Sequence, residues 1–317
     1  MTFSIPDRWV WDFWLTRDGE DWHAFYLHAP KSLGDPEARH HNARIGHAVS
    51  EDLRDWQRLP DPFPAGPTGE WDDLATWTGS VVRTGNQWWM FYSGVSTLDG
   101  GKVQRIGAAV SDDLLMWEKV SQNPLSEADA RWYEKLDFDA WYEEAWRDPW
   151  VFADPDGEGF HMFITARVAI GPAATRGVIG HATSGDLLNW EAQPPVTDSG
   201  TYGHMEVPQQ ISIGDRHYLL FCVPGRVQPG VDNALTGTGY LIADSLLGPY
   251  RLGPTPFVFA DPQGSLHAGK VIEIDDEYVF LATEHNGPGG SYVGRISSPM
   301  PVVVADDGGL SAISARK

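Results

Sequence analysis

The sequence is poor in cysteine, in basic residues and in long apolar segments. Among 317 residues there is one cysteine, Cys222, so no disulfide can form within the chain, and its apolar strand predicts a buried, unreactive thiol. Lys and Arg number 23 against 44 Asp and Glu, and the net charge of −21 argues against a nucleic-acid partner. No segment approaches the roughly 20 apolar residues of a transmembrane helix. The N-terminal MTFSIPDRWVWDFW lacks the basic and apolar regions of a signal peptide, so we expect no membrane partner and a cytoplasmic location.

Tryptophan and glycine, in contrast, are plentiful, and a short unit recurs along the chain. The 15 Trp and 34 Gly favour many short strands joined by tight turns. The unit GHAVSEDLRDW (46–56) returns as GAAVSDDLLMW (107–117) and GHATSGDLLNW (180–190), with a weaker copy at 239–250. Aromatic strands of one kind accompany this repeat, at 22–30, 88–96, 160–168, 217–225 and 278–286. A period of about 60–70 residues indicates a repeated structural unit.

Each unit predicts four antiparallel strands. An apolar strand with one polar residue comes first, then the aromatic strand, a Gly-Ala strand, a Ser-x-Asp-Leu turn and a short outer strand such as WEKV. Radial packing of such units is a β-propeller, which buries many short sheets without exposed edges. We therefore expect an all-β, five-bladed propeller, formed by one domain over 1–317, whose first strands line a central funnel.

The turn motif and two long connections have separate expected roles. The motif aspartates should accept hydrogen bonds from the turn backbone, and the motif tryptophans should fill space between neighbouring sheets. These residues are Asp52, Asp113, Asp186, Trp56, Trp117 and Trp190. The acidic, aromatic segment 121–146 interrupts the period, has a partly helical pattern, and should wall a pocket at one rim of the propeller. The Gly-rich loop 226–238 should lie at another rim.

Polar residues at matching positions of the five first strands should converge on the axis. They are separated by 66, 70, 58 and 61 residues, and are Asp12, Thr78, Asp148, Glu206 and His267. Three carboxylates at one end of a channel repel each other, so a purely structural protein has little reason to keep them. Glycoside hydrolysis requires two carboxylates that flank the bond, one to attack or activate water and one to donate a proton. The pattern thus predicts a carbohydrate-cleaving site.

The sequence around each carboxylate supports this interpretation. Trp11 and Trp14 belong to an aromatic group around Asp12, of the kind on which sugars stack. Arg147 precedes Asp148 and should help to keep it ionised. Apolar neighbours of Glu206 should raise its pKa, as a general acid needs.

Several segments resemble the five-bladed propeller glycoside hydrolases that act on fructosides, families 32 and 68. VWDFW (10–14) resembles the VWDSW segment of levansucrases, and WHAFYLHAP resembles the HLFYQYNP strand of invertases. WTGSVV is similar to the W/F-S-G-S segment, RDPWVF contains the shared Arg-Asp-Pro triplet, and MEVP corresponds to Glu-Cys-Pro or Glu-Arg-Pro. GHAVSEDLRDW is similar to the invertase GHATSTDLVHW. The resemblance extends over essentially the whole chain.

This resemblance implies a role for each matched residue. Asp12 would be the nucleophile, Asp148 the transition-state stabiliser that grips fructosyl hydroxyls, and Glu206 the acid/base. The mechanism would be retaining, with the nucleophile and acid/base carboxyls ~5 Å apart. The remaining substrate contacts would come from Trp11, Trp14, Trp77, Thr78, Arg147, His204 and His267.

The chain also departs from the family pattern. Leu27 replaces a substrate-binding glutamine of invertases, and His204 and Val207 stand where levansucrases have Glu and Arg, which weighs against polymer synthesis. We expect no counterpart of the C-terminal β-sandwich of family 32. A fifth-blade histidine helps to hold a channel metal in the related family 43, but His267 has no evident companion ligands. We therefore expect no metal and no cofactor.

The leading hypothesis is a retaining β-fructofuranosidase acting on sucrose or short fructo-oligosaccharides. The alternatives are a fructosyltransferase or difructose-anhydride-forming enzyme, an inverting arabinofuranosidase-like hydrolase with Asp12 as general base, and a silent sugar-binding propeller. The identity of the leaving group should depend on the rim loops, mainly 31–44, 94–105, 121–146 and 226–238.

Overall fold

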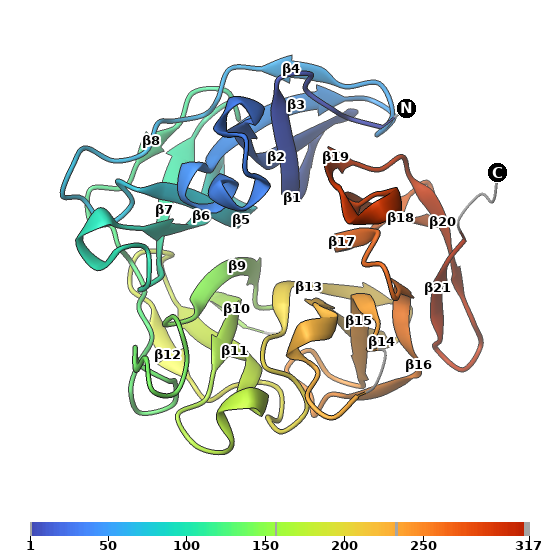
Figure 1. The fold of residues 1–317 in the computed structure, drawn as a ribbon. Helices are drawn as coiled ribbons and strands as arrows, with labels where there is room; N and C mark the ends of the chain where they lie inside the picture. The colour runs from blue at the N-terminus through green and yellow to red at the C-terminus, as the bar shows by residue number, and fades with distance from the viewer. Residues whose placement is uncertain (1, 156, 232–233, 314–317) are drawn as a thin grey trace.

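The chain forms five β-sheets arranged in a ring around a central axis (Figure 1). The computed structural model describes residues 2–155, 157–231 and 234–313. Each of the first four sheets has four antiparallel strands in sequence order, with the first strand at the axis. The predicted five-bladed, all-β propeller is thereby confirmed. Among the described residues, no helix is long and apolar enough to cross a lipid bilayer.

The strands of the first three blades follow the predicted repeat. Blade one contains β1 (Arg8–Asp18), β2 (Asp21–Pro30), β3 (Arg44–Ser50) and β4 (Gln57–Leu59). Blade two contains β5 (Ala75–Thr84), β6 (Gln87–Val95), β7 (Arg105–Ser111) and β8 (Glu118–Lys119). Blade three contains β9 (Trp146–Ala153), β10 (Phe160–Arg167), β11 (Gly177–Ser184) and β12 (Glu191–Gln193).

The last two blades complete the ring, and the fifth differs in its outer part. Blade four contains β13 (Glu206–Ile213), β14 (Arg216–Val223), β15 (Thr236–Ala243) and β16 (Arg251–Asp261). Blade five contains β17 (Leu266–Ile274), β18 (Glu277–Asn286), β19 (Tyr292–Ile296), β20 (Met300–Val304) and β21 (Leu310–Ala312). Both β19 and β20 pair with β18, so the third position is split between two strands. Phe3 and Ile296 exchange two backbone hydrogen bonds of 3.0 Å, which join the N-terminal segment to blade five.

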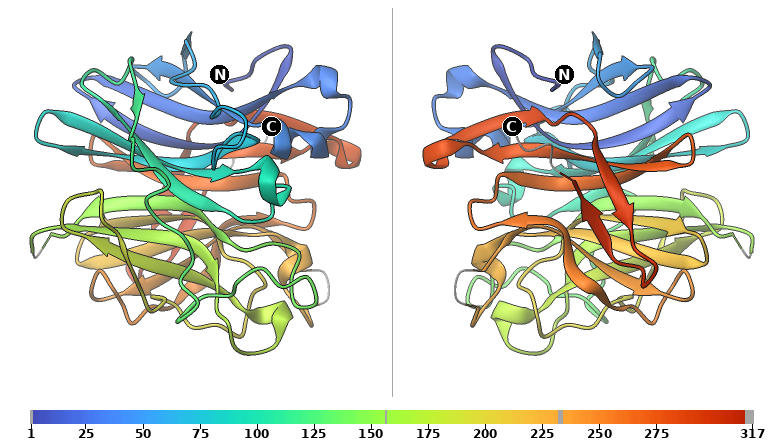
Figure 2. Two further views of the ribbon diagram at one scale, coloured as in Figure 1. Left: turned by 90° about the vertical axis from the view of Figure 1, so that its left-hand side faces the viewer. Right: turned by 90° about the vertical axis from the view of Figure 1, so that its right-hand side faces the viewer.

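In the described part of the chain, six short 3-10 helices interrupt the loops, and the side views place them on one face of the ring (Figure 2). They are η1 (Lys31–Leu33), η2 (Pro36–Asn42), η3 (Thr97–Asp99), η4 (Ala173–Thr175), η5 (Gly225–Val227) and η6 (Pro288–Gly290). All of them lie between the second and third strands of a blade. This face therefore carries the variable loops.

The repeated Ser-x-Asp-Leu motif is structural, as predicted. The Asp113 carboxylate accepts hydrogen bonds from the backbone N–H groups of Leu115 and Met116, at 2.9 and 2.8 Å. Trp117 donates its indole N–H to the Leu114 carbonyl and packs edge-on against Phe25 of blade one at 5.6 Å. The motif thus fastens the outer turn and seals the contact between two blades.

The segment 121–146 contains no helix, although every one of its residues is described. The partly helical pattern was therefore misleading. Its backbone bonds to the neighbouring blades instead: Ser126 pairs with Ile106, and the Glu134 N–H donates to the Arg167 carbonyl at 2.8 Å. Its apolar side chains, such as the fully buried Tyr133, join the apolar cluster between blades two and three. Tertiary packing has overridden local propensity here.

Every inner strand carries a β-bulge near the end that faces the loop-bearing side. The pairing register shifts between Trp11 and Phe13 in β1, and at the equivalent place in the other four inner strands. Four of the bulge residues have left-handed backbones, with φ of 29°, 57°, 54° and 51° for Asp12, Asp148, Val207 and Ala268. Such bulges recur near active sites, where they redirect side chains. The five bulges shape the axial funnel.

Candidate active site

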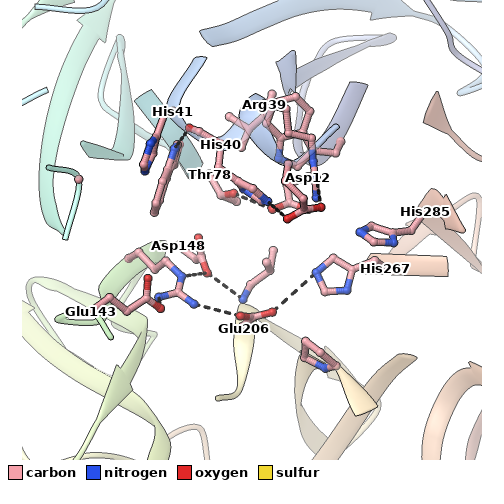
Figure 3. Close-up of a pocket in the computed structure, with 18 of the residues that line it drawn as sticks. Asp12, Arg39, His40, His41, Thr78, Glu143, Asp148, Glu206, His267 and His285 are labelled. Carbon is pink, nitrogen blue, oxygen red and sulfur yellow. Dashed lines mark hydrogen bonds and ion pairs between the residues drawn. The ribbon is translucent and has the colours of Figure 1, made fainter. Parts of the chain in front are cut away.

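A pocket of about 440 Å³ opens at the axis on the loop-bearing face (Figure 3). All five blades contribute to its wall. The predicted site residues among its lining are Trp11, Asp12, Trp77, Thr78, Arg147, Asp148, Glu206 and His267. The structure therefore brings together the three carboxylates that the sequence singled out. The insertion 121–146 supplies Tyr142 and Glu143, and so walls the pocket as predicted.

The five converging residues occupy two consecutive strand positions rather than one, and each position forms a ring of side chains around the axis. Asp12, Thr78 and Asp148 occupy bulge positions, which Val207 and Ala268 fill in blades four and five. Glu206 and His267 lie one residue earlier in their strands, paired with Cys222 and Thr283. The Trp11, Trp77 and Arg147 side chains share this second ring. The predicted one-position alignment is corrected accordingly, because the extra residue of each bulge offsets adjacent side chains without moving them out of the pocket.

Asp12 is held by one hydroxyl group. Thr78 Oγ1 donates to Asp12 Oδ2 at 3.2 Å (Figure 3). The other oxygen, Oδ1, is buried and has no hydrogen-bond partner among the described residues. Since a buried acceptor without a partner is costly, this oxygen is suited to a group that arrives with the substrate.

Asp148 lines the pocket but is only 5% exposed. Its Oδ2 accepts hydrogen bonds from Thr165 Oγ1 at 2.8 Å and from the Val207 N–H at 3.2 Å. Burial raises the pKa of Asp148 to about 6, although Arg147 and Thr165 act in the opposite direction. As expected, the Arg147 charge favours the ionised form of Asp148, but burial and the Asp12 charge outweigh it. The guanidinium stands 3.6 Å from Asp148 Oδ2 and directs its hydrogen bonds to other groups.

Glu206 uses its two oxygens differently. Oε1 accepts from Arg147 at 3.0 Å and lies 3.3 Å from His204 Nδ1. Oε2 lies 3.8 Å from His267 Nε2 (Figure 3). Burial alone would raise the pKa of Glu206, but the His204 hydrogen bond and the Arg147 charge outweigh it and bring the pKa well below its usual value. The prediction of a raised pKa at Glu206 was wrong, since charged and hydrogen-bonding partners replace the apolar surroundings that its sequence neighbours suggested.

Arg147 connects the acidic groups of blades three and four. Besides Glu206, it donates to Gln104 Oε1 and to Glu143 Oε1, each at 2.9 Å. Gln104 Nε2 in turn donates to Glu143 at 2.9 Å. Most of the guanidinium hydrogen bonds are therefore made within the protein, and the network holds Glu206 in one orientation.

Two predicted substrate contacts lie behind the pocket wall. Trp14 is 1% exposed and belongs to the core between blades one and two, stacked with Phe25 at 6.1 Å. His204 is completely buried, and its Nε2 accepts the indole N–H of Trp141 at 3.1 Å. These two assignments are corrected: Trp14 packs the core, because side chains alternate along β1, and His204 acts on Glu206 from behind.

The bulges are stabilised by side chains of the preceding blade. The backbone N–H of Asp148 donates to Ser93 Oγ at 2.8 Å, and that of Val207 donates to Thr165 Oγ1 at 3.1 Å. The Ala268 N–H donates to Cys222 Sγ at 2.8 Å. Cys222 is 1% exposed, and burial raises the pKa of its thiol to about 11. The thiol is buried and un-ionised, as predicted, and it also satisfies a bulge amide.

Sequence reasoning missed the contribution of η2, whose residues Glu37, Arg39, His40 and His41 line the pocket (Figure 3). Trp77 donates its indole N–H to the His40 carbonyl at 2.7 Å, and the His40 ring lies edge-on to Trp11 and Trp77 at 6.3 and 6.5 Å. Burial lowers the pKa of His40 to about 3. The run Arg-His-His in a rim loop was the available signal, but nothing local indicates which way such a loop folds.

The described residues contain no group of three or more His, Cys, Asp or Glu side chains placed to hold a metal ion. His267 instead faces Glu206 and lies 5.4 Å from His285, ring centre to ring centre.

A five-bladed propeller whose axial pocket holds converging carboxylates is the architecture of a glycoside hydrolase. The chain belongs to glycosyl hydrolase family 32: the model of the family's N-terminal domain matches residues 14–246. The resemblance that the motifs indicated is confirmed.

Individual relatives agree with this family. The extracellular sucrase of Zymomonas mobilis is 27% identical over 360 residues, covering 96% of this chain and 81% of the relative. The inulosucrase from Halalkalicoccus jeotgali bound to kestose has a TM-score of 0.79 at 21% identity, over 97% of this chain and 87% of that chain. Bacillus subtilis levansucrase has a TM-score of 0.76 at 13% identity, over 98% and 87%. At these identities the solved structures support the fold. The cytoplasmic location expected for this chain stays a prediction.

Proposed function

We propose that the protein is a retaining β-fructofuranosidase that cleaves sucrose or short fructo-oligosaccharides through a covalent fructosyl-enzyme. The observation that carries the proposal is the convergence of Asp12, Asp148 and Glu206 in one axial pocket. Its volume of about 440 Å³ lies within the range of small-molecule sites. Family membership and the sucrase relative support a fructoside as substrate.

The contacts suggest how the work is divided. Asp12, held by Thr78, would attack the anomeric carbon of the fructosyl group. Glu206 would protonate the leaving oxygen through Oε2, because Oε1 is already engaged by Arg147 and His204. Water would then hydrolyse the fructosyl-enzyme, with Glu206 acting as base. Asp148 would accept hydrogen bonds from fructosyl hydroxyls.

Substrate binding would also change which pocket carboxyl group is protonated. In the free pocket the raised pKa belongs to Asp148 and the lowered pKa to Glu206. Sugar hydroxyls that donate to Asp148 favour its ionised form and lower its pKa. Ionised Asp148 adds a negative charge near Glu206, and because the carboxylates of one site titrate as a coupled group, this would raise the Glu206 pKa towards the value that a general acid needs.

The test is the Asp12→Asn variant, assayed for fructose release from sucrose. We expect a loss of at least about 10⁴-fold, because no other pocket carboxylate would serve as nucleophile. Asp21→Asn, an exposed carboxylate at the far end of the β1–β2 hairpin, is the matched control and should retain activity. Wild-type fructose release by Asp12→Asn would refute the proposal.

The same preparation separates the remaining alternatives. Equal release of glucose and fructose at high sucrose indicates hydrolysis, whereas an excess of glucose with new oligosaccharides indicates fructosyl transfer. NMR of the first fructose anomer distinguishes retention from inversion. Hydrolysis of an arabinofuranoside would indicate the inverting hydrolase. Binding of sucrose, fructo-oligosaccharides or arabinofuranosides without turnover of any of them would indicate a silent sugar-binding propeller.

A further inference from the structure

A buried lysine lies beside the bulge of blade four, behind the residues that line the pocket, and the proposed reaction does not use it. Lys270 is on β17 and is 3% exposed. Its Nζ donates to the carbonyls of Val207 and Pro208, at 3.0 and 3.3 Å. The ammonium also lies 5.4 Å from the centre of the Trp150 ring. Lys270 therefore reaches from blade five to the bulge of blade four, directly after Glu206.

A buried ammonium is costly unless anions or acceptors compensate it. Among the described residues, Lys270 forms no ion pair within 4.0 Å, and its hydrogen bonds go to neutral carbonyls. Burial lowers the pKa of Lys270 to about 8, while the Cys222 thiol, Asp148 and Asp12 act to raise it. Val207 accepts from Lys270 through its carbonyl and donates its N–H to Asp148 Oδ2 at 3.2 Å, so one residue links the ammonium to a pocket carboxylate. The thiol is un-ionised near neutral pH, so the charges that stabilise the ammonium are the two pocket carboxylates.

The carboxylates need such a charge. Asp12 has one hydroxyl donor and an oxygen without a partner among the described residues, and Asp148 is disfavoured as an anion by burial. Arg147 lies near Asp148, but its NH1 and NH2 groups are directed to Gln104, Glu143 and Glu206. No group of three potential metal ligands is present in the described part of the chain to supply a cation.

We propose that Lys270 is a positioning residue that acts as the internal counter-charge of the pocket: its ammonium, anchored on the carbonyls of blade four, stabilises the anionic forms of Asp12 and Asp148 from below. The inference rests on the proposed function only in giving Asp12 the nucleophilic role. The electrostatic coupling itself is a property of the folded chain.

The electrostatic coupling between Lys270 and the pocket carboxylates can be measured without an activity assay. The sequence has six lysines, so NMR of protein labelled at lysine Cε and Nζ gives few signals, and Lys270→Met assigns the one of interest. Removing a nearby anion destabilises the ammonium, so Asp12→Asn and Asp148→Asn should each lower the Lys270 pKa by about half a unit or more. Asp21→Asn should not change it. If neither pocket variant shifts the signal, the proposal is overturned, whatever Asp12→Asn does to fructose release.

Kinetics provide the second arm. Lys270→Met and Lys270→Gln both remove the charge, and Gln keeps an N–H donor for the blade-four carbonyls. The acid limb of the kcat/KM profile should move to higher pH by about one unit in both, with kcat affected more than KM. Lys119→Met removes a partly buried lysine, paired with Asp72 at 2.7 Å outside the pocket, and should leave the profile unchanged. A wild-type profile for Lys270→Gln would refute the role of the charge. If the Lys270 variants fail to fold, the carboxylate variants still decide the question.

Discussion

His204 Nδ1 stands 3.3 Å from Glu206 Oε1, and its tautomer follows from the residue on its other side. The indole of Trp141 can only donate, so His204 Nε2 accepts and the ring proton is assigned to Nδ1. Arg147 NH2 also lies 3.3 Å from Nδ1, and we assign its donated hydrogen to Glu206 Oε1 at 3.0 Å instead. A completely buried histidine thus donates a hydrogen bond to the proposed acid/base. This contact helps to explain why the pKa of Glu206 is lowered in the free enzyme.

Replacing His204 by Phe should therefore raise the Glu206 pKa. Loss of a hydrogen bond to a charged group is worth about 1.5–3 kcal/mol, which corresponds to about one to two pKa units. The alkaline limb of the kcat/KM profile should move to higher pH. His204→Asn keeps a side-chain N–H and should restore much of the wild-type profile. An unshifted limb in His204→Phe would show that the hydrogen bond does not set the Glu206 pKa.

Asp148 predicts an unusual dependence of stability on pH. Its pKa rises from about 3.9 in the unfolded chain to about 6 in the fold, so the folded state binds the proton more tightly. The resulting stabilisation is complete below pH ~4 and is lost as the pH rises through 6, a difference of roughly 3 kcal/mol. Asp148→Asn cannot titrate, and its stability relative to wild type should increase from pH 4 to 7, as measured by urea unfolding.

Asp113 provides the control of opposite sign. Hydrogen bonds from the Met116 and Leu115 backbone lower its pKa, so its contribution is present above the unfolded pKa and is lost as the pH falls. Asp113→Asn should therefore become less stable relative to wild type as the pH rises. The same trend in both variants would argue against the Asp148 assignment.

We expect the single hydrogen-bond acceptor of Cys222, its Sγ atom, to contribute measurably to the stability of the fold. Cys222→Ala leaves the Ala268 N–H buried without its partner and should cost about 1–3 kcal/mol in the free energy of unfolding. Cys222→Ser retains an acceptor and should lose less. Denaturant titration measures both. If Ala and Ser are equally destabilised, volume rather than hydrogen bonding determines the effect.

We expect replacement of His40 to weaken sucrose binding without changing the pH dependence of kcat/KM. Its pKa of about 3 keeps the imidazole neutral above pH ~4, so it offers a ring and a neutral hydrogen-bonding group to a sugar in the pocket. His40→Ala should raise KM for sucrose about tenfold and leave both limbs of the profile in place. His217→Ala, at the distant β13–β14 hairpin, is the control. A shifted limb would instead assign His40 to proton transfer.

Much of the architecture was readable from local pattern. The repeat with Asp52, Asp113 and Asp186 specifies a turn through hydrogen bonds to its own backbone, and alternating apolar residues specify which strand faces share a core. Five such units imply five blades, and blade symmetry alone brings Asp12, Asp148 and Glu206 to one axis. The segment 121–146 escaped this reasoning because its backbone partners belong to other blades.

The sequence by itself determined the blades, because these depend on interactions between residues close in sequence. The repeat of the blades then identified the acidic trio, and the motifs around the trio identified the family. Only the tertiary structure decided the chemistry of the trio. The bulges offset Glu206 and His267 by one ring, η2 brought His40 to the pocket, and Lys270 reached across from blade five. The pKa of each carboxyl sums burial, charges and hydrogen bonds from several blades, so Glu206 became the lowered group and Asp148 the raised one.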